Sequence, residues 1–317
     1  MLTRRDSLKL AMAAGATAAL PASVLAAFDP AKLITRAIPK SGEALPIVGL
    51  GSSATFRRVA QSEDVSALAE VMKVLVENGG TVFDTAPSYG ESEAVSGQIA
   101  LDAGMTDRIF WATKVNALGR GEAGPADPAK VSAQLERSFE RAHKDPIDLV
   151  QVHNLADLPT QMGAIQELKE EGRIRYIGTT ATNPRRDADL EQAMKDYPID
   201  FIGVDYAVDN RRAAERILPL AQDLGIATLI YVPFGRSRLF ARTAGMEVPE
   251  WAQEFGATSW GQFFIKYVAA HPATTCVTPA TSKAKNMLDN IGAAYGDLPG
   301  KGALRRMEEL VDGLPGA

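Results

Sequence analysis

The sequence predicts a single (β/α)8 TIM barrel, an α/β fold in which eight parallel strands close into a cylinder inside a ring of helices. Short apolar runs alternate with amphipathic runs eight times along the chain, an order typical of a parallel sheet covered by helices. No Gly-x-Gly-x-x-Gly motif follows any of these runs, which disfavours a doubly wound dinucleotide-binding sheet. No low-complexity linker divides the 317 residues, so we expect one domain.

Each predicted element follows from its local pattern. The segment ITRAIPKSGEALPIVGLG, which begins at Ile34, predicts an N-terminal hairpin that turns at Ser41-Gly42 and leads into the first strand. The first helix has apolar residues at helical spacing and is ended by Gly79-Gly80. The predicted strands cover residues 47–50, 81–83, 109–113, 147–152, 173–177, 201–204, 227–231 and 275–278. The predicted helices cover residues 64–78, 91–101, 129–142, 158–171, 186–195, 211–224, 259–270 and 282–294, and an accessory helix covers residues 303–314.

The first 26 residues, MLTRRDSLKLAMAAGATAALPASVLA, have the three-part plan of an export signal. A charged start with Arg4 and Arg5 precedes a weakly apolar run over residues 8–20 and small residues around Ala26. The Arg4-Arg5 pair resembles a twin-arginine signal. We therefore expect residues 1–26 to be a signal peptide, residues 27–317 to form the barrel domain, and the protein to be exported to the periplasm. An N-terminal amphipathic helix is the alternative.

Composition excludes several classes of function. A formal net charge of −5 argues against nucleic acid as a partner, because phosphate binding needs a basic face. No spacing of His, Cys, Asp and Glu predicts a metal site, and we expect no membrane span in the mature chain. The single cysteine, Cys276, lies in an apolar run and allows no internal disulfide. We expect a monomer or a weak homo-oligomer.

Polar side chains stand where three consecutive predicted strands end. Asp84 follows the second strand, Lys114 follows the third, and His153 follows the fourth. Tyr89 lies on the loop after the second strand. The carboxyl ends of the strands meet at one rim of a barrel, so we expect these four side chains to converge there. The alternative is that Asp84 and the Tyr89 loop only terminate a strand and form a turn.

The chemistry of the four side chains is complementary. A tyrosine has a pKa of about 10 and is a poor acid at neutral pH, but a nearby ammonium lowers that pKa. A carboxylate beside the lysine keeps the ammonium charged and in place. A histidine near the tyrosine can orient a carbonyl oxygen. Together, Asp84, Tyr89, Lys114 and His153 predict a proton donor for a carbonyl group that accepts a hydride.

The motifs FDTAPSYGESE, FWATKV, DLVQVHNL, GRIRYIGTT and VTPATSKAKNMLDNIG resemble the aldo/keto reductase family, in order and over roughly residues 34–294. The resemblance implies that Tyr89 is the general acid, Lys114 tunes it, Asp84 is the partner of the lysine and His153 orients the carbonyl. It implies reduction of a small aldehyde or ketone to an alcohol, or the reverse, with hydride from NADPH. The alternative is a nucleotide-binding or sensor protein that does not turn over. The export signal supports it, because free NADPH is not expected outside the cytoplasm.

The resemblance also implies an extended nicotinamide nucleotide across the barrel mouth. Tyr231 is expected to stack on the nicotinamide, and Asp289 and Asn290 are expected to hold the adenine. The other expected cofactor contacts are Gly51, Ser52, Asp84, Thr180, Pro233, Phe234, Gly235, Thr281, Ser282 and Lys283. Phe56 and Trp251, on the loops after the first and seventh strands, are expected to line the substrate pocket.

Five positions depart from the pattern of the family. Thr180 stands where a serine is usual, Ala181 where an asparagine is usual and Gly203 where a glutamine is usual, and the usual residues hold the carboxamide of the nicotinamide. Ala280 and Asn286 stand where many members have a basic residue for the 2'-phosphate. The lost carboxamide contacts would cost about 1–3 kcal/mol each unless other groups replace them. NADPH is therefore the predicted cofactor, with NADH left open.

Overall fold

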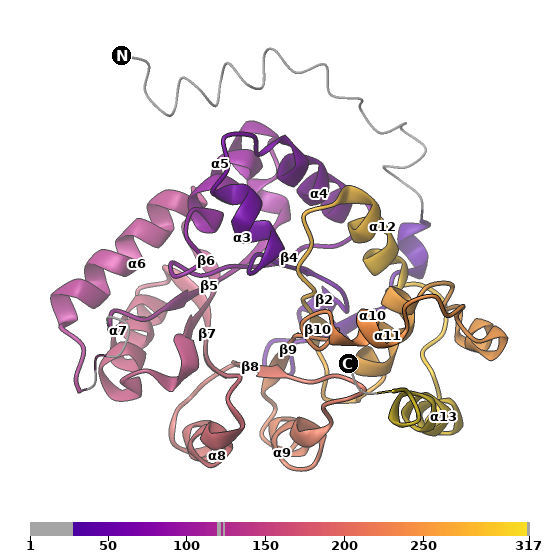
Figure 1. The fold of residues 1–317 in the computed structure, drawn as a ribbon. Coiled ribbons are helices and arrows are strands. Elements are labelled where there is room, and N and C mark those ends of the chain that lie inside the picture. Colours follow the sequence, from indigo (N-terminus) through magenta and orange to yellow (C-terminus); the bar gives the residue numbers. More distant parts are fainter. Residues whose placement is uncertain (1–27, 119–121, 123, 316–317) are drawn as a thin grey trace.

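The computed structural model describes residues 28–118, 122 and 124–315, and the predicted export signal lies outside these residues. Its centre is a sheet of eight parallel strands in the order of the sequence, which confirms the predicted barrel (Figure 1). The strands are β3 (Leu50–Gly51), β4 (Val82–Asp84), β5 (Phe110–Val115), β6 (Ile147–Val152), β7 (Ile174–Ala181), β8 (Phe201–Asp205), β9 (Ala227–Tyr231) and β10 (Cys276–Val277).

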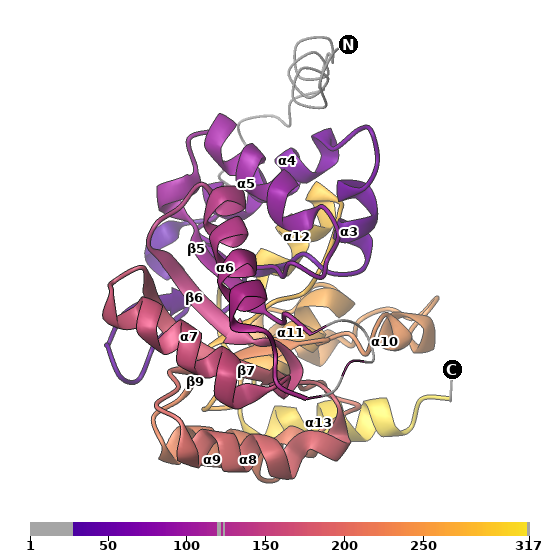
Figure 2. The same ribbon diagram turned by 90° about the vertical axis from the view of Figure 1, so that its left-hand side faces the viewer.

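Helices surround this sheet, and most follow a strand as the sequence predicts (Figures 1 and 2). The ring consists of α4 (Ser66–Glu77), α5 (Ser92–Asp102), α6 (Pro128–Ala142), α7 (Leu158–Glu170), α8 (Asp187–Asp196), α9 (Ile217–Asp223), α11 (Trp260–Ala269) and α12 (Ala284–Gly292). The predicted accessory helix is α13 (Lys301–Asp312). Two short helices, α3 (Thr55–Ala60) and α10 (Arg238–Arg242), follow β3 and β9 and were not predicted.

Local chemistry explains where helices begin. The Asp127 side chain caps α6 by accepting a hydrogen bond from the Ala129 amide, and Pro128 occupies the first helical position. The prediction of a single helix over residues 211–224 is wrong. The segment forms a 3-10 turn over Arg212–Ala214 and then α9, because Pro219 has no amide hydrogen and is tolerated only in the first turn of a helix.

The N-terminal hairpin closes one end of the barrel. Strands β1 (Thr35–Ala37) and β2 (Ala44–Pro46) pair antiparallel, as predicted. Ile38 and Leu45 are buried in a cluster with apolar residues from the amino-terminal halves of the barrel strands, including Phe110 and Phe201. The polar side chains at the carboxyl ends of the strands therefore lie at the other end, which the hairpin leaves uncovered.

The first and last strands meet at a seam. Backbone hydrogen bonds run from Gly49 to the carbonyl of Val277 (2.9 Å) and from Val277 to the carbonyl of Ile47 (2.8 Å). A side chain at Gly51 would put its Cβ 2.7 Å from the Thr278 carbonyl oxygen, so the close approach of the strands requires glycine there. Outside the seam, α4 and α12 lie side by side and complete the ring of helices (Figures 1 and 2).

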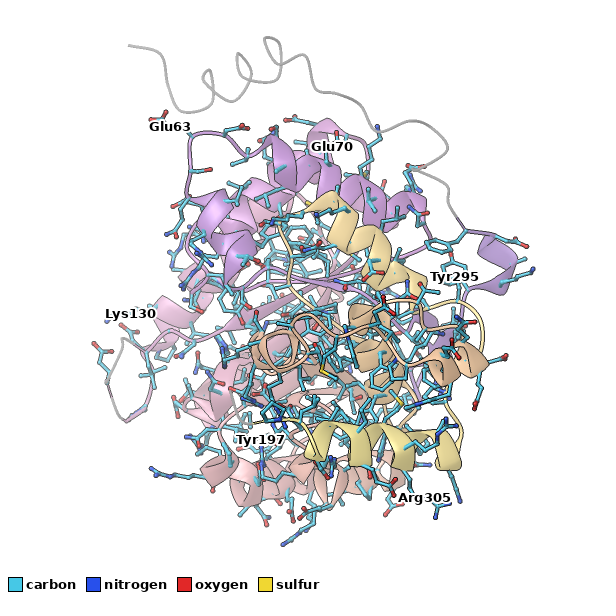
Figure 3. All side chains as sticks on the ribbon, turned by 45° about the vertical axis from the view of Figure 1, so that its right-hand side comes forward. Glu63, Glu70, Lys130, Tyr197, Tyr295 and Arg305 are labelled. Atoms are coloured by element: carbon cyan, nitrogen blue, oxygen red, sulfur yellow. The ribbon has the colours of Figure 1, made fainter. Side chains whose placement is uncertain are left out.

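Charged side chains such as Glu63, Lys130 and Arg305 point outward, whereas the apolar ones fill the barrel and its contact with the helices (Figure 3). Among the described residues, no helix combines the length and the apolar character needed to cross a membrane. The same residues contain no group of three or more His, Cys, Asp or Glu side chains placed to hold a metal ion.

Candidate active site

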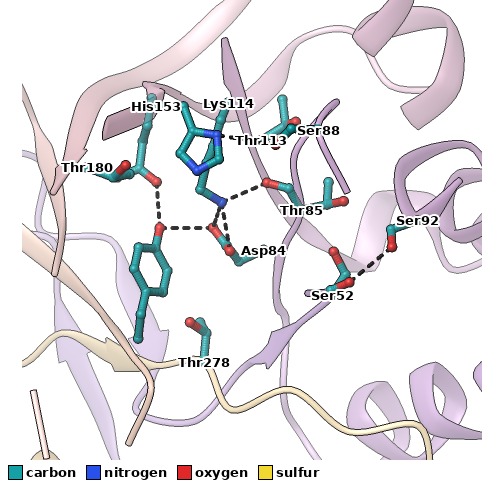
Figure 4. Close-up of polar contacts among 12 residues, drawn as sticks. Ser52, Asp84, Thr85, Ser88, Ser92, Thr113, Lys114, His153, Thr180 and Thr278 are labelled. Carbon is teal, nitrogen blue, oxygen red and sulfur yellow. Dashed lines mark hydrogen bonds and ion pairs between the residues drawn. The ribbon is translucent and has the colours of Figure 1, made fainter. Parts of the chain in front are cut away.

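The four predicted catalytic side chains come together at the carboxyl ends of the strands. Lys114, on β5, donates hydrogen bonds to both carboxylate oxygens of Asp84, the last residue of β4, and to the carbonyl of Thr85, each at 2.8 Å (Figure 4). The Lys114 Nζ atom lies 5.1 Å from the centroid of the Tyr89 ring. The rings of Tyr89 and His153 meet edge to face with centroids 5.9 Å apart.

The loop after β4 presents Tyr89 to this cluster. The Tyr89 amide donates to the carbonyl of Ala86 at 3.0 Å, which closes a tight turn. Gly90 follows in the left-handed region with φ 61°, a conformation that glycine adopts without strain. The dipeptide Tyr89-Gly90 therefore both ends the turn and places the phenol beside Lys114 and His153.

Lys114 and Asp84 form an almost completely buried pair. Only 1% of the surface of Lys114 and 3% of the surface of Asp84 is exposed. Burial lowers the pKa of Lys114, but its interactions with Asp84 and Tyr89, led by the charge of the Asp84 carboxylate, outweigh burial and raise this pKa above its usual value. Burial raises the pKa of Asp84, and Lys114 partly offsets that effect. The three acceptors around Nζ satisfy the three ammonium hydrogens, so the buried charge has full compensation.

The acid–base properties of Tyr89 and His153 follow from burial. Burial raises the pKa of Tyr89 above its usual value, and Lys114 only partly offsets this. The expectation of a lowered pKa for Tyr89 is therefore wrong, because desolvation of the phenolate outweighs the ammonium. Burial, followed by the charge of Lys114, lowers the pKa of His153 to about 3. At neutral pH both side chains are uncharged, and each can donate a hydrogen bond to a carbonyl oxygen.

The sequence did not point to two further polar residues of the site. Gln151, on β6, is within 3.1 Å of the Tyr231 hydroxyl, which also donates to Asp84 Oδ1 at 3.1 Å. Asp205 is the last residue of β8, as Asp84 is the last residue of β4. The search for polar residues at strand ends, which identified Asp84, could therefore have identified Asp205 as well. Its Oδ1 atom is buried and has no hydrogen-bond partner among the described residues. Burial raises the pKa of Asp205 to about 6, and Arg236 partly offsets this.

The predicted cofactor residues near the tetrad lie on the same rim. Gly51 ends β3, and the Oγ atom of the next residue, Ser52, is buried without a partner in the part of the chain that the structure describes. Thr180, on β7, accepts a hydrogen bond from the Asn154 amide at 2.9 Å, which leaves its hydroxyl hydrogen free to be donated. Tyr231 ends β9 and is half-buried.

The loop after β9 contains Pro233, Phe234 and Gly235 and has an unusual backbone. Val232, Gly235, Arg236 and Ser237 all have positive φ. Successive turns of this kind direct backbone N–H groups into concavities that bind anions, and the guanidinium of Arg236 adds a positive charge. The side chain of Phe234 packs on Phe240 with ring centroids 4.8 Å apart. Contact of Pro233, Phe234 and Gly235 with a nucleotide stays a prediction.

The residues expected at the adenosine end follow β10 and lie on α12. Thr281 accepts a hydrogen bond from the Lys283 amide at 3.2 Å, and Lys283 itself is exposed, with Ser282 half-buried between them. Asp289 accepts hydrogen bonds from Ser259 Oγ (2.7 Å) and Gln262 Nε2 (3.0 Å), so it already holds the start of α11. Asn290 is 4% exposed. Their contact with an adenine stays a prediction.

Of the two expected pocket residues, Phe56 lies in the core, and the place of Trp251 in a substrate pocket stays a prediction. Phe56 lies on α3, is fully buried and packs on Phe83 with ring centroids 5.7 Å apart. It is a core residue, because the unpredicted helix α3 turns its ring inward. Trp251 is half-buried beneath the guanidinium of Arg306, 4.2 Å from the ring centroid. A cleft of about 260 Å³ lies at the end of β7, and its lining residues are Asn154, Ala181, Thr182, Asn183 and Arg186.

Comparison with known proteins agrees with this geometry. The family model described as "Aldo/keto reductase family" matches residues 47–301. The chain is 28% identical over 282 residues to "Aldo-keto reductase str7" of Strobilurus tenacellus, covering 78% of this chain and 81% of that protein. It is 31% identical over 195 residues to "Aldo-keto reductase YhdN" of Bacillus subtilis (strain 168), covering 58% and 57% of the two chains.

Solved structures show the same fold. The holo form of aldo-keto reductase AKR11C1 from Bacillus halodurans superimposes with a TM-score of 0.70 at 24% identity, covering 88% of this chain and 96% of that one. An aldo/keto reductase from Klebsiella pneumoniae, in complex with NADP and acetate, superimposes with a TM-score of 0.68 at 21% identity, covering 88% and 95%. Because the family model spans most of the barrel and the tetrad is assembled within it, the chain belongs to the aldo/keto reductase family.

Proposed function

We propose that the protein reduces a small aldehyde or ketone to an alcohol, or catalyses the reverse reaction, with NADPH as the hydride donor. The observation that carries this function is the assembly of Tyr89 and His153 edge to face beside the buried ion pair of Lys114 and Asp84. Nucleotide binding without turnover is not favoured, because binding alone does not require a charged lysine beside a phenol in a buried site.

Each tetrad residue has a distinct task in carbonyl reduction. A bound NADPH would supply the hydride that the carbonyl carbon accepts. Tyr89 gives its phenolic proton to the carbonyl oxygen, which becomes the hydroxyl of the alcohol. The neutral His153 ring donates a hydrogen bond to the same oxygen and orients it, as its pKa of about 3 allows. Lys114 stabilises the phenolate that is left on Tyr89, and Asp84 holds Lys114 in place.

The residues at the barrel mouth fit a nicotinamide nucleotide. Ser52 Oγ, Thr85 Oγ1 and Asp205 Oδ1 are buried polar atoms without a hydrogen-bond partner among the described residues, and each can bind a polar group of a ligand. The loop after β9 suits a pyrophosphate. The complex of the Klebsiella pneumoniae relative with NADP supports the same cofactor for this chain. Lys283 supplies a charge for the 2'-phosphate where Ala280 and Asn286 do not.

Nucleotide affinity tests the cofactor assignment. NADPH should bind more tightly than NADH, because the Lys283 ammonium would pair with the 2'-phosphate, a group that NADPH has and NADH lacks. Lys283→Ala should lower the affinity for NADPH about tenfold and leave that for NADH unchanged, because a charge-assisted hydrogen bond contributes about 1.5–3 kcal/mol. Titration followed by tryptophan fluorescence measures both. Lys195→Ala, an exposed lysine in the last turn of α8, is the control. Equal affinity for the two nucleotides would contradict selection of NADPH by Lys283.

We further propose that the protein is exported to the periplasm by a twin-arginine signal over residues 1–26. The support is the sequence itself: Arg4-Arg5, the short apolar run and the small residues near Ala26. Twin-arginine export carries folded proteins, so NADPH can be bound before transport. Changing Arg4 and Arg5 together to lysine should leave the protein in the cytoplasm, as measured by cell fractionation. Normal export of this variant would contradict the twin-arginine assignment.

A further inference from the structure

Gly203 leaves room for a ring from the neighbouring strand. It lies in β8 and is buried. A Cβ atom at this position would lie 2.4 Å from Cε2, 2.6 Å from the hydroxyl oxygen and 2.7 Å from Cζ of Tyr231. Cβ atoms do not approach other heavy atoms below 3.0 Å, so any other residue at 203 would displace the ring. The Tyr231 ring therefore occupies the space beside Gly203, the position where the resemblance to the family implies a glutamine.

The position of the Tyr231 ring beside Gly203 matters because it lets the Tyr231 hydroxyl reach the catalytic tetrad. It lies 3.1 Å from Asp84 Oδ1 and 3.1 Å from Gln151 Oε1, and Lys114 Nζ is 5.3 Å from the ring centroid. A phenol has one hydrogen and can donate it to only one acceptor at a time. The carboxylate is the stronger acceptor, because hydrogen bonds to a charged group are shorter and stronger than those between neutral groups.

The backbone beside Tyr231 is strained in a way that fixes its direction. Val232 has φ 56°, a left-handed conformation that a β-branched residue rarely adopts. Such strain persists only where the surrounding structure imposes it. On one side Tyr231 pairs with Asp205 of β8, and on the other the Val232 carbonyl accepts from the Gly235 amide at 3.0 Å. These contacts end the strand with the Tyr231 side chain directed across the barrel.

We propose that Tyr231 is a positioning residue of the catalytic site, whose hydroxyl holds the Asp84 carboxylate in the orientation that fixes Lys114, and that Gly203 is required for the ring to reach it. The proposal rests on the proposed reductase function. It gives Tyr231 a task in addition to the stacking on nicotinamide expected from its position. It also explains the glycine at position 203. Without a side chain, this position loses a contact with the cofactor, but it leaves the space through which the Tyr231 phenol reaches Asp84.

Tyr231→Phe separates the two tasks of the residue. The ring remains, so the Kd of NADPH should change less than twofold, whereas kcat should fall about tenfold. The pH profile of kcat should also move. Asp84 is faced by Lys114 from β5, Tyr89 from its own loop, Tyr231 from β9 and Cys276 from β10. The Tyr231 hydrogen bond lowers the pKa of Asp84, so its loss raises that pKa, and activity should disappear at a higher pH as the solution is acidified.

Gly203→Ala tests the need for space. In the wild-type background it should lower kcat at least as much as Tyr231→Phe, because the ring must leave Asp84. In the Tyr231→Ser background, which has no ring to displace, it should change kcat less than twofold. Gly163→Ala on α7 is the matched control, since apart from its chain neighbours and the backbone of its own helix no atom of the described residues lies within 4 Å of the Cβ it adds. Thermal unfolding of each variant shows that it is folded.

The outcomes distinguish this proposal from the reductase function. If the wild-type protein reduces none of a panel of aldehydes and ketones, the proposed function fails, and the positioning role that rests on it fails with it. If the wild type is active and Tyr231→Phe keeps its kcat and the acid limb of its pH profile, the positioning role of Tyr231 is wrong. Equal effects of Gly203→Ala with and without the Tyr231 ring would overturn the role of Gly203.

Discussion

Replacing Tyr89 by phenylalanine is expected to lower kcat for any accepted aldehyde by about 10²–10⁴, the usual contribution of a positioned general acid. The ring and its edge-to-face contact with His153 remain, so the fold and the nucleotide affinity should change little. The hydroxyl acts only in the chemical step, and the loss should therefore appear in kcat and not in the Kd of the cofactor. Single-turnover oxidation of bound NADPH, with a panel of small aldehydes and ketones, measures the step directly.

Tyr197→Phe is the matched control, because it removes a phenol hydroxyl from the residue that follows α8 and makes no contact with the catalytic cluster among the described hydrogen bonds and ring pairs (Figure 3). It should keep wild-type rates. Wild-type single-turnover rates in the Tyr89→Phe enzyme would contradict the assignment of Tyr89 as the proton donor. The strand-end cluster would then have a structural role only.

Replacing Lys114 by methionine should damage both activity and stability. Lys114 lowers the pKa of Tyr89 against the effect of burial, so without it this already raised pKa rises further and the phenol becomes a weaker acid. We expect a fall in kcat comparable to that of Tyr89→Phe. The buried Asp84 carboxylate also loses its partner, which typically costs about 3–5 kcal/mol of the free energy of unfolding. Denaturant titration and single-turnover kinetics measure the two effects.

The double variant Lys114→Met/Asp84→Asn separates these effects. It removes the unpaired charge, and the amide oxygen of the introduced asparagine side chain still accepts the hydrogen bond from Tyr231. Most of the lost stability should return, whereas activity should not, because no cation is left beside Tyr89. Recovery of activity together with stability would show that Lys114 contributes to the fold and not to the acidity of the phenol.

The tetrad could be predicted from the sequence because its signal is local. Asp84, Lys114 and His153 each stand where an apolar run ends, and the alternation of strands and helices brings such positions to one rim. The strands over residues 147–152 and 227–231 were predicted with their observed bounds, since buried parallel strands form continuous apolar runs. The short helices α3 and α10 are five or six residues long and carry no extended periodic pattern.

The features that could not be predicted depend on packing between distant residues. The pKa of Tyr89 is set by burial, which motif spacing does not reveal, so the sequence suggested the wrong direction. Phe56 was expected in the pocket because its loop follows a barrel strand, but the ring packs into the core on Phe83. At Gly203, the sequence shows only a missing glutamine. That a ring from β9 takes the space is visible only when the two strands are side by side.

The seam between β3 and β10 has a consequence for the motions of the barrel. Along β6 and β7 five residue pairs are in register, whereas β3 and β10 are joined by isolated bridges. Segments with few backbone hydrogen bonds open before the rest of a protein unfolds, so the amide hydrogens of Gly49 and Val277 should exchange with solvent earlier than those of β6. The predicted cofactor contacts lie on both sides of this seam, with Ser52 next to β3 and Thr281 beyond β10. A nucleotide bound by residues on both sides of the seam would slow this exchange. Closure of the seam and binding of the nucleotide would then be coupled, each favouring the other.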